Sequence, residues 1–263
     1  MNISATRAKE SLRHLIDHGR SSLPNLNEVL DLLEQVYGPQ QPVGPTDPFE
    51  MIVYLNCGYP ASDASCLKGF DALKREAGLS PREILAAPKS KLVKLLRLGG
   101  IVPELRADRL KEIARKVKGE FRGDLKAELK ERLREEQQQK GKGIRGATKV
   151  LQQFPVIGEP SAEKILLFSR LAPVAAVPSA NVEVPARLWF GKAGKNYAAD
   201  YRAARRILSA GLTEAFEVRQ RAYLLLKRHG QLTCKRSRPR CEICPLTGQC
   251  AYIQLQAADR DIV

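Results

Sequence analysis

Four cysteines in the last part of the sequence have the type and spacing of metal ligands. Cys234, Cys241, Cys244 and Cys250 are separated by spacers of six, two and five residues, so a single loop can bring all four thiolates to one centre. A 4Fe-4S cluster is held by four such thiolates at separate corners. Zinc accepts the same ligands, but its structural sites usually pair two Cys-x-x-Cys knuckles, and only one is present. The spacing favours an iron-sulfur cluster and leaves zinc as the alternative.

The surroundings of these cysteines are basic. Lys235, Arg236, Arg238 and Arg240 crowd the first spacer. They either offset the charge of an anionic cluster or contact phosphate, and both readings stay open. The two other cysteines, Cys57 and Cys66, are expected to be buried core thiols.

The overall charge favours a polyanionic partner. Lys and Arg number 44 against 29 Asp and Glu, a formal net charge of +15, which points first to nucleic acid and second to an anionic membrane surface. No segment approaches the roughly 18 consecutive apolar residues of a spanning helix. The stretch 1–13 mixes charges and lacks the apolar core of a signal peptide. We therefore expect a cytoplasmic protein without membrane association.

Apolar residues recur at three- and four-residue spacing, which predicts an all-α protein. Asp47 before Pro48 is typical of a helix start, and the Gly- and Pro-rich stretch 38–45 marks a lobe boundary or a long loop. Helices are expected near 25–36, 48–56, 64–77, 80–87, 89–97, 106–117, 126–139, 161–170, 182–189, 196–210 and 213–228.

The strongly charged stretch 119–146 interrupts this pattern. We interpret it as a solvated insertion, with a phosphate-contacting arm as the alternative. The segment 151–166 that follows predicts a helix, a tight turn at Pro155-Val156-Ile157-Gly158, and a second helix entered through Ser161. Backbone N–H groups at the start of that helix can bind a phosphate. A plain αα-corner would carry the same glycine and proline.

These motifs together resemble the helix-hairpin-helix base-excision DNA glycosylases, the endonuclease III-like superfamily. Asp47-Pro48-Phe49-Glu50 resembles the opening barrel helix of that family, residues 58–63 resemble its Ser-x-Gln-x-Thr-Asp loop, and Phe154 to Gly158 resembles its Leu-Pro-Gly-Val-Gly hairpin. The cysteine spacing is that of the family's cluster loop. The resemblance implies a 4Fe-4S cluster at 234–250, a six-helix barrel at 46–168, and a second helical lobe formed by 1–45 and 169–263.

The resemblance also implies a monomer that binds double-stranded DNA, including damaged or distorted duplexes. Tyr59 is expected to stack on an unpaired base or to pack with its hydroxyl in water, and Arg97, Arg106 and Arg109 are expected to contact phosphates or to be solvated charges. The residues expected to face DNA are Tyr59, Gly99, Gly100, Pro155, Val156, Ile157, Gly158 and Ser161.

Three family side chains are replaced by proline. Pro160 stands at the position of the lysine that forms a Schiff base, so β-lyase activity is not expected. Pro178 stands at the position of the catalytic aspartate, and Pro60 at that of a glutamine that fills the gap left by a flipped base. Glu183 is the preferred substitute acid, ahead of Glu159 and Glu163, although a first-turn glutamate is also favoured by the helix dipole.

Three functions follow from this pattern. The first is a DNA-binding iron-sulfur protein in base-excision repair or damage recognition that has lost the usual reaction. The alternative is an active monofunctional DNA N-glycosylase that uses Glu183. A redox protein that uses its cluster for electron transfer is the third, and neither the basic charge nor the hairpin supports it.

Overall fold

The computed structural model describes residues 24–58, 62–137, 143–192, 194 and 196–260. All regular structure in these residues is helical, and they contain no β-strand. The predicted all-α class is therefore confirmed. None of the helices in the described ranges combines the length and the apolar composition that crossing a membrane requires.

The chain divides into two compact units. The central unit comprises 41–176 and 214–220, and the terminal unit comprises 177–213, 221–263 and the residues up to 40. The helices of the central unit are α3 (Pro48–Gly58), α4 (Asp63–Glu76), α5 (Pro81–Ala86), α6 (Lys89–Leu96), α7 (Pro103–Glu120), α8 (Leu125–Gln137), α9 (Gly143–Leu151) and α10 (Glu159–Phe168).

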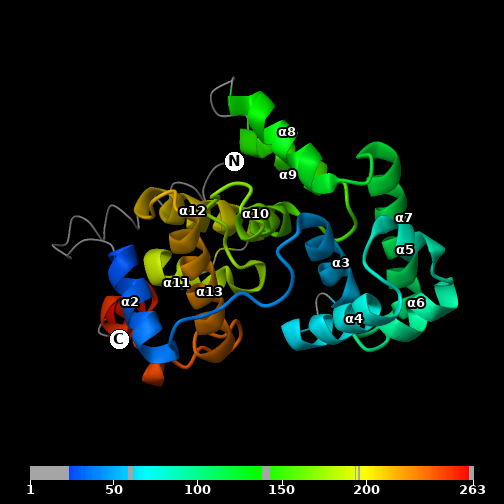
Figure 1. Ribbon diagram of the computed structural model, residues 1–263. Helices are drawn as coiled ribbons and strands as arrows, with labels where there is room; N and C mark the ends of the chain where they lie inside the picture. The colour runs from blue at the N-terminus through cyan, green and yellow to red at the C-terminus, as the bar shows by residue number, and fades with distance from the viewer. Residues whose placement is uncertain (1–23, 59–61, 138–142, 193, 195, 261–263) are drawn as a thin grey trace, which may run out of the picture. The chain divides into compact units, whose positions relative to one another are not determined.

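Helix α3 lies at the core of the central unit. Its start is fixed by Asp47, whose Oδ1 accepts hydrogen bonds from the N–H groups of Phe49 at 2.9 Å and Glu50 at 3.2 Å. The helix is buried on nearly all its faces and contacts α4, α7, α8 and α10, while α5 and α6 pack on α7 (Figure 1). The Asp47-Pro48 signal thus predicts this element correctly.

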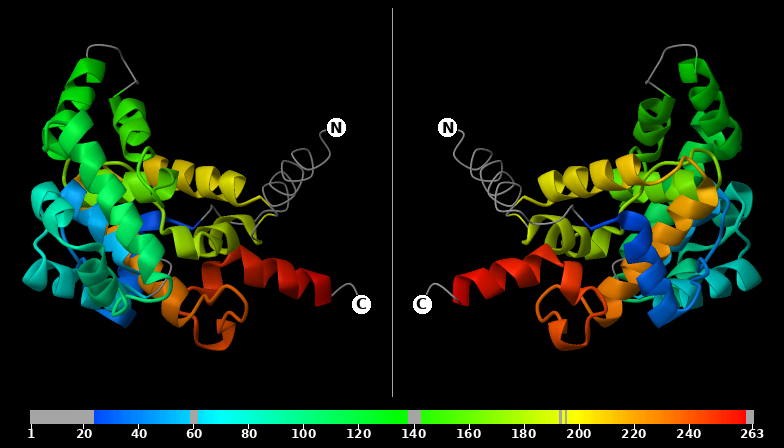
Figure 2. Two further views of the ribbon diagram at one scale, coloured as in Figure 1. Left: turned by 90° about the vertical axis from the view of Figure 1, so that its right-hand side faces the viewer. Right: turned by 90° about the vertical axis from the view of Figure 1, so that its left-hand side faces the viewer.

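The charged stretch is more folded than the sequence indicated. Helices α8 and α9 lie side by side (Figure 2), and Leu125 and Leu129 of α8 are 1% and 0% exposed. The expectation that the stretch 119–146 is a solvated insertion is wrong for these two leucines, because widely spaced leucines among many charges still form one apolar stripe.

The terminal unit joins distant parts of the sequence. Its helices are α2 (Leu26–Tyr37), α11 (Glu183–Phe190), α12 (Tyr197–Gly211), most of α13 (Phe216–Leu232) and α14 (Ala251–Arg260). Arg221 of α13 binds Asp31 and Glu34 of α2 at 2.7 and 2.8 Å, and Trp189 Nε1 donates to the Pro24 carbonyl at 3.1 Å. These contacts hold α2 to the C-terminal helices.

Candidate metal centre and nucleic-acid interface

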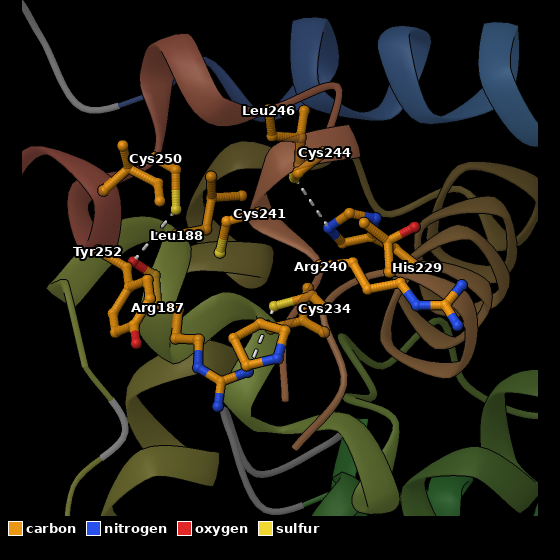
Figure 3. A pocket seen from close by; sticks show the side chains of 14 residues that line it. Arg187, Leu188, His229, Cys234, Arg240, Cys241, Cys244, Leu246, Cys250 and Tyr252 are labelled. Atoms are coloured by element: carbon orange, nitrogen blue, oxygen red, sulfur yellow. Dashed lines mark hydrogen bonds between the residues drawn. The ribbon is translucent and has the colours of Figure 1, made fainter. Parts of the chain in front are cut away.

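The loop between α13 and α14 carries the four predicted ligands. Two short 3₁₀ turns, Cys241–Ile243 and Thr247–Gln249, shape it. The sulfur atoms of Cys234, Cys241, Cys244 and Cys250 face a common space (Figure 3). They line a small cavity of about 20 Å³ that is partly open to solvent. The four predicted ligands therefore line one pocket.

Arg187 of α11 fixes the first spacer of this loop. Its Nη1 donates to the Lys235 carbonyl at 2.8 Å and lies 3.5 Å from Cys234 Sγ, and its Nη2 donates to the Arg236 carbonyl at 2.6 Å. Sequence reasoning missed this residue, because a single arginine on a short helix gives no local sign of its partners.

The thiols of the loop are partly shielded from water. Burial raises the pKa of Cys244 to about 11 and also raises the pKa of Cys250. Metal binding would replace these protons. Within the described residues, no three His, Cys, Asp or Glu side chains are grouped as ligands of a single metal ion. The four sulfurs thus share one cavity without meeting at one point.

Cys57 and Cys66 are core thiols, as predicted. They are 0% and 3% exposed, and burial strongly raises the pKa of Cys57. A fully buried thiol of raised pKa is a poor nucleophile.

Two buried polar side chains connect the three segments expected to face DNA. Asn56 Nδ2 donates to the Pro155 carbonyl of the hairpin at 3.3 Å. Arg106 donates to the carbonyls of Asn56 at 3.2 Å, Gly58 at 3.3 Å and Ile101 at 2.7 Å. The end of α3, the loop before α7 and the hairpin therefore meet around Asn56 and Arg106.

Arg106 does not have the phosphate-contacting role considered for it. The residue is 4% exposed and its guanidinium is occupied by the three carbonyls. The physical reason is that α7 begins at Pro103 and not at Arg106. Arg106 therefore lies inside the helix, on the face that packs against the end of α3.

The glycines of this loop allow two backbones to approach closely. A Cβ on Gly99 would lie 2.0 Å from the Cys57 carbonyl oxygen, and one on Gly58 would lie 2.7 Å from the Gly99 oxygen. Gly100 has a φ of 147°, which disfavours any other residue. The predicted Gly99-Gly100 loop is thus packed against the end of α3.

The same loop presents an apolar surface. Ile101 is 78% exposed, and Leu98, Val102 and Leu105 are 46 to 56% exposed. Arg97 lies beside them with a side chain 71% exposed. Large exposed apolar side chains next to a cation are typical of an interaction surface.

The hairpin connects α9 to α10. Ile157 N–H donates to the Phe154 carbonyl at 3.2 Å and closes the turn. Val156 has a φ of 61°, an unfavourable conformation for a β-branched residue, at the place of a family glycine. Gly158 precedes α10, and a Cβ added to it would make one ordinary contact, with Pro160 Cδ at 3.8 Å. Ser161 lies in the first turn of α10.

Two of the possible substitute acids, Glu163 and Glu183, and Lys164, the lysine nearest to Pro160 in the sequence, are held by other parts of the fold. Glu163 is 1% exposed, and Glu183 Oε1 lies 3.0 Å from Arg236 Nε. The Lys164 ammonium lies 6.0 Å from the centre of the Tyr54 ring. Pro160 lies in the first turn of α10 and Pro178 precedes a 3₁₀ turn. The role of Glu183 as a substitute acid stays a prediction. In the structure its carboxylate forms an ion pair with Arg236 within the terminal unit.

Two predicted positions are not covered. Tyr59 and Pro60 lie outside the described residues.

Arg109 is partly exposed on α7, so its expected contact with phosphate stays a prediction.

Known proteins provide a fold comparison. No protein-family model and no curated protein matches this chain. An endonuclease III in a non-covalent DNA complex superposes with a TM-score of 0.68 at 17% identity, over 91% of this chain and 100% of that chain. A thermostable thymine-DNA glycosylase gives 0.65 at 18% identity, over 88% and 95%.

A third solved structure is more distant. The Helicobacter pylori 3-methyladenine DNA glycosylase bound to 1,N6-ethenoadenine gives a TM-score of 0.55 at 15% identity, over 79% of this chain and 97% of that chain. The predicted resemblance is confirmed at the level of the fold. This chain has the all-α fold of endonuclease III and of the helix-hairpin-helix DNA glycosylases.

Proposed function

We propose that this protein binds distorted or damaged double-stranded DNA and carries a 4Fe-4S cluster, without the usual glycosylase and lyase chemistry. The observation that carries DNA binding is the meeting of the hairpin, the end of α3 and the Ile101 loop around Asn56 and Arg106. Apolar side chains inserted between base steps are a common means of holding kinked DNA. The net charge of +15 supplies the attraction to phosphate.

The donor set of the cysteine loop supports a cluster over zinc. Four thiolates that line one cavity suit a 4Fe-4S cluster, which binds one thiolate at each of its four iron atoms. A structural zinc site usually combines two Cys-x-x-Cys pairs, and this loop has one, Cys241 and Cys244. Cys234, Cys241, Cys244 and Cys250 would hold the cluster, which would brace the loop between α13 and α14.

The proline replacements support the loss of ordinary catalysis. Pro160 has no amine that can form an imine, and the Lys164 amine is directed at the Tyr54 ring. The Glu183 carboxylate is paired with Arg236. The function therefore rests on recognition and not on bond cleavage.

The test uses the protein purified without oxygen. We expect iron and sulfide in equal amounts, about four of each per chain, and binding to a duplex with an abasic analogue that is tighter than binding to intact duplex and weakens with salt. Zinc without iron would overturn the cluster. Equal, salt-independent affinity for the two duplexes would overturn DNA recognition.

A nicking assay separates this function from the enzymatic alternative. Duplexes carrying uracil, oxidised or alkylated bases are incubated with the protein, treated with alkali and resolved by length, with an active glycosylase in parallel. We expect intact strands. Cleavage at the lesion that disappears in Glu183→Gln would establish the monofunctional glycosylase instead.

A further inference from the structure

A partly buried chain of polar side chains leads from α2 to the cysteine cavity. His229 of α13 is 2% exposed. Its Nδ1 lies 2.8 Å from the Tyr37 hydroxyl, which lies 2.7 Å from Thr233 Oγ1. On the opposite side of the ring, His229 Nε2 lies 3.8 Å from Cys244 Sγ (Figure 3). One imidazole thus bridges a tyrosine and a predicted metal ligand.

A metal-bound Cys244 would select one tautomer of His229. A neutral imidazole carries a single N–H, on Nδ1 or on Nε2, and these two atoms face the Tyr37 hydroxyl and Cys244 Sγ respectively. If Nδ1 held that proton, the lone pair of Nε2 would face the electron-rich sulfur of a metal-bound Cys244. If Nε2 holds it, Thr233 donates to Tyr37, Tyr37 donates to Nδ1, and Nε2 donates to the sulfur. Of the two, only this second arrangement suits a metal-bound Cys244, because a ligating thiolate carries no proton to donate.

We infer that His229, held by Tyr37 and Thr233, is a positioning residue of the metal centre that donates its Nε2–H to the Cys244 thiolate. This inference rests on the proposed cluster. A hydrogen bond to a ligating sulfur stabilises negative charge on the cluster, so it favours the reduced state and raises the reduction potential. It also restrains Cys244, which comes from the only Cys-x-x-Cys pair of the loop.

The test measures the cluster directly. Iron and sulfide per chain are determined first on the unmodified protein, and their absence would refute the cluster itself and the inference with it. His229→Phe keeps a ring of similar size and removes the N–H. Tyr37→Phe removes the donor that fixes the tautomer. Each variant is examined by mediated redox titration and by the Fe–S stretching bands in resonance Raman spectra.

We expect His229→Phe to bind a full cluster whose potential is shifted to a more negative value, with Fe–S bands altered in frequency. Tyr37→Phe should shift the potential in the same direction by a smaller amount, and His229→Gln, which keeps an N–H donor, should restore part of the shift. Tyr201→Phe is the matched control, because Tyr201 is a buried tyrosine of the same unit, 1% exposed, that does not line the cavity.

Two results would overturn the inference while the proposed cluster stood. One is an unchanged potential and unchanged Fe–S bands in His229→Phe at full cluster content. The other is a shift in Tyr201→Phe as large as that in Tyr37→Phe. If His229→Phe does not fold, Tyr37→Phe decides alone, because it deletes one hydroxyl, and an unaltered potential in that variant refutes the role of His229.

Discussion

Arg187 Nη1 lies 3.5 Å from Cys234 Sγ while the same guanidinium donates to the carbonyls of the first spacer. Arg187→Lys keeps the charge but loses this planar set of donors. We expect iron to be lost to a chelator about tenfold faster, as is common for groups that orient metal ligands. Arg202→Lys, an exposed position on α12, is the control. Equal rates in the two variants would contradict the role of Arg187.

Val156 supports a prediction about strain in the hairpin. A left-handed conformation costs a non-glycine residue roughly 1–2 kcal/mol, and glycine loses about 0.5–1 kcal/mol in entropy. We therefore expect Val156→Gly to leave the free energy of unfolding unchanged or to raise it by about 0.5 kcal/mol. Val150→Gly, on the buried face of α9, should lower it by about 3 kcal/mol. Urea denaturation compares them, and a comparable loss in both would exclude strain at Val156.

Arg106 should contribute to stability and not to the electrostatics of DNA binding. Arg106→Met leaves three carbonyls without their donor and should cost about 3 kcal/mol, whereas Arg106→Lys should cost less. The salt dependence of DNA binding should not change in Arg106→Lys, but its slope should fall by about one in Arg97→Ala, if that exposed cation contacts a phosphate. A reduced slope in Arg106→Lys would place the side chain at a phosphate after all.

Ile101 should contribute to DNA binding and not to stability, the opposite of Arg106. Because the side chain is 78% exposed, Ile101→Ala should change the free energy of unfolding by less than about 0.5 kcal/mol. Its affinity for a duplex with an abasic analogue should fall about tenfold, equivalent to about 1.4 kcal/mol. Val36→Ala, 56% exposed on α2, is the control for fluorescence anisotropy titrations. Unchanged affinity in Ile101→Ala would remove this loop from the interface.

Leu129 tests whether the charged helix α8 is part of the fold. Leu129→Ala should lower the free energy of unfolding by about 2–4 kcal/mol, the usual range for a buried leucine. Lys130→Ala, at an exposed neighbouring position, should lie within about 0.5 kcal/mol of the unmodified protein. Thermal and urea denaturation measure both. An unchanged free energy of unfolding in Leu129→Ala would support the interpretation of 119–146 as a solvated insertion.

Local signals made much of the fold predictable. Asp47 before Pro48 defines the start of α3, and Ser80 with Glu83 forms a complete capping box at α5, because each signal acts within one turn. The cysteine spacing likewise predicts a shared cavity. The helix after Cys250 was not expected, because its apolar pattern is short.

Long-range contacts were not predictable. Arg97 and Arg106 look alike in the sequence, yet one is exposed and the other is buried beneath three carbonyls. The difference depends on where α7 begins and on which backbone ends near it. The partners of Arg187 and His229 are hidden for the same reason: they come from elements that only the tertiary fold brings together.

The contact between Tyr37 and His229 spans 192 residues of sequence. The central unit is built almost entirely from one continuous segment, 41–176, so it can form during synthesis before the cysteine loop leaves the ribosome. The terminal unit cannot form until α13 has been synthesised, because α2 packs against it. Contacts between segments so far apart in the sequence form slowly. Insertion of the proposed cluster is therefore expected to be a late event, after the central unit has folded.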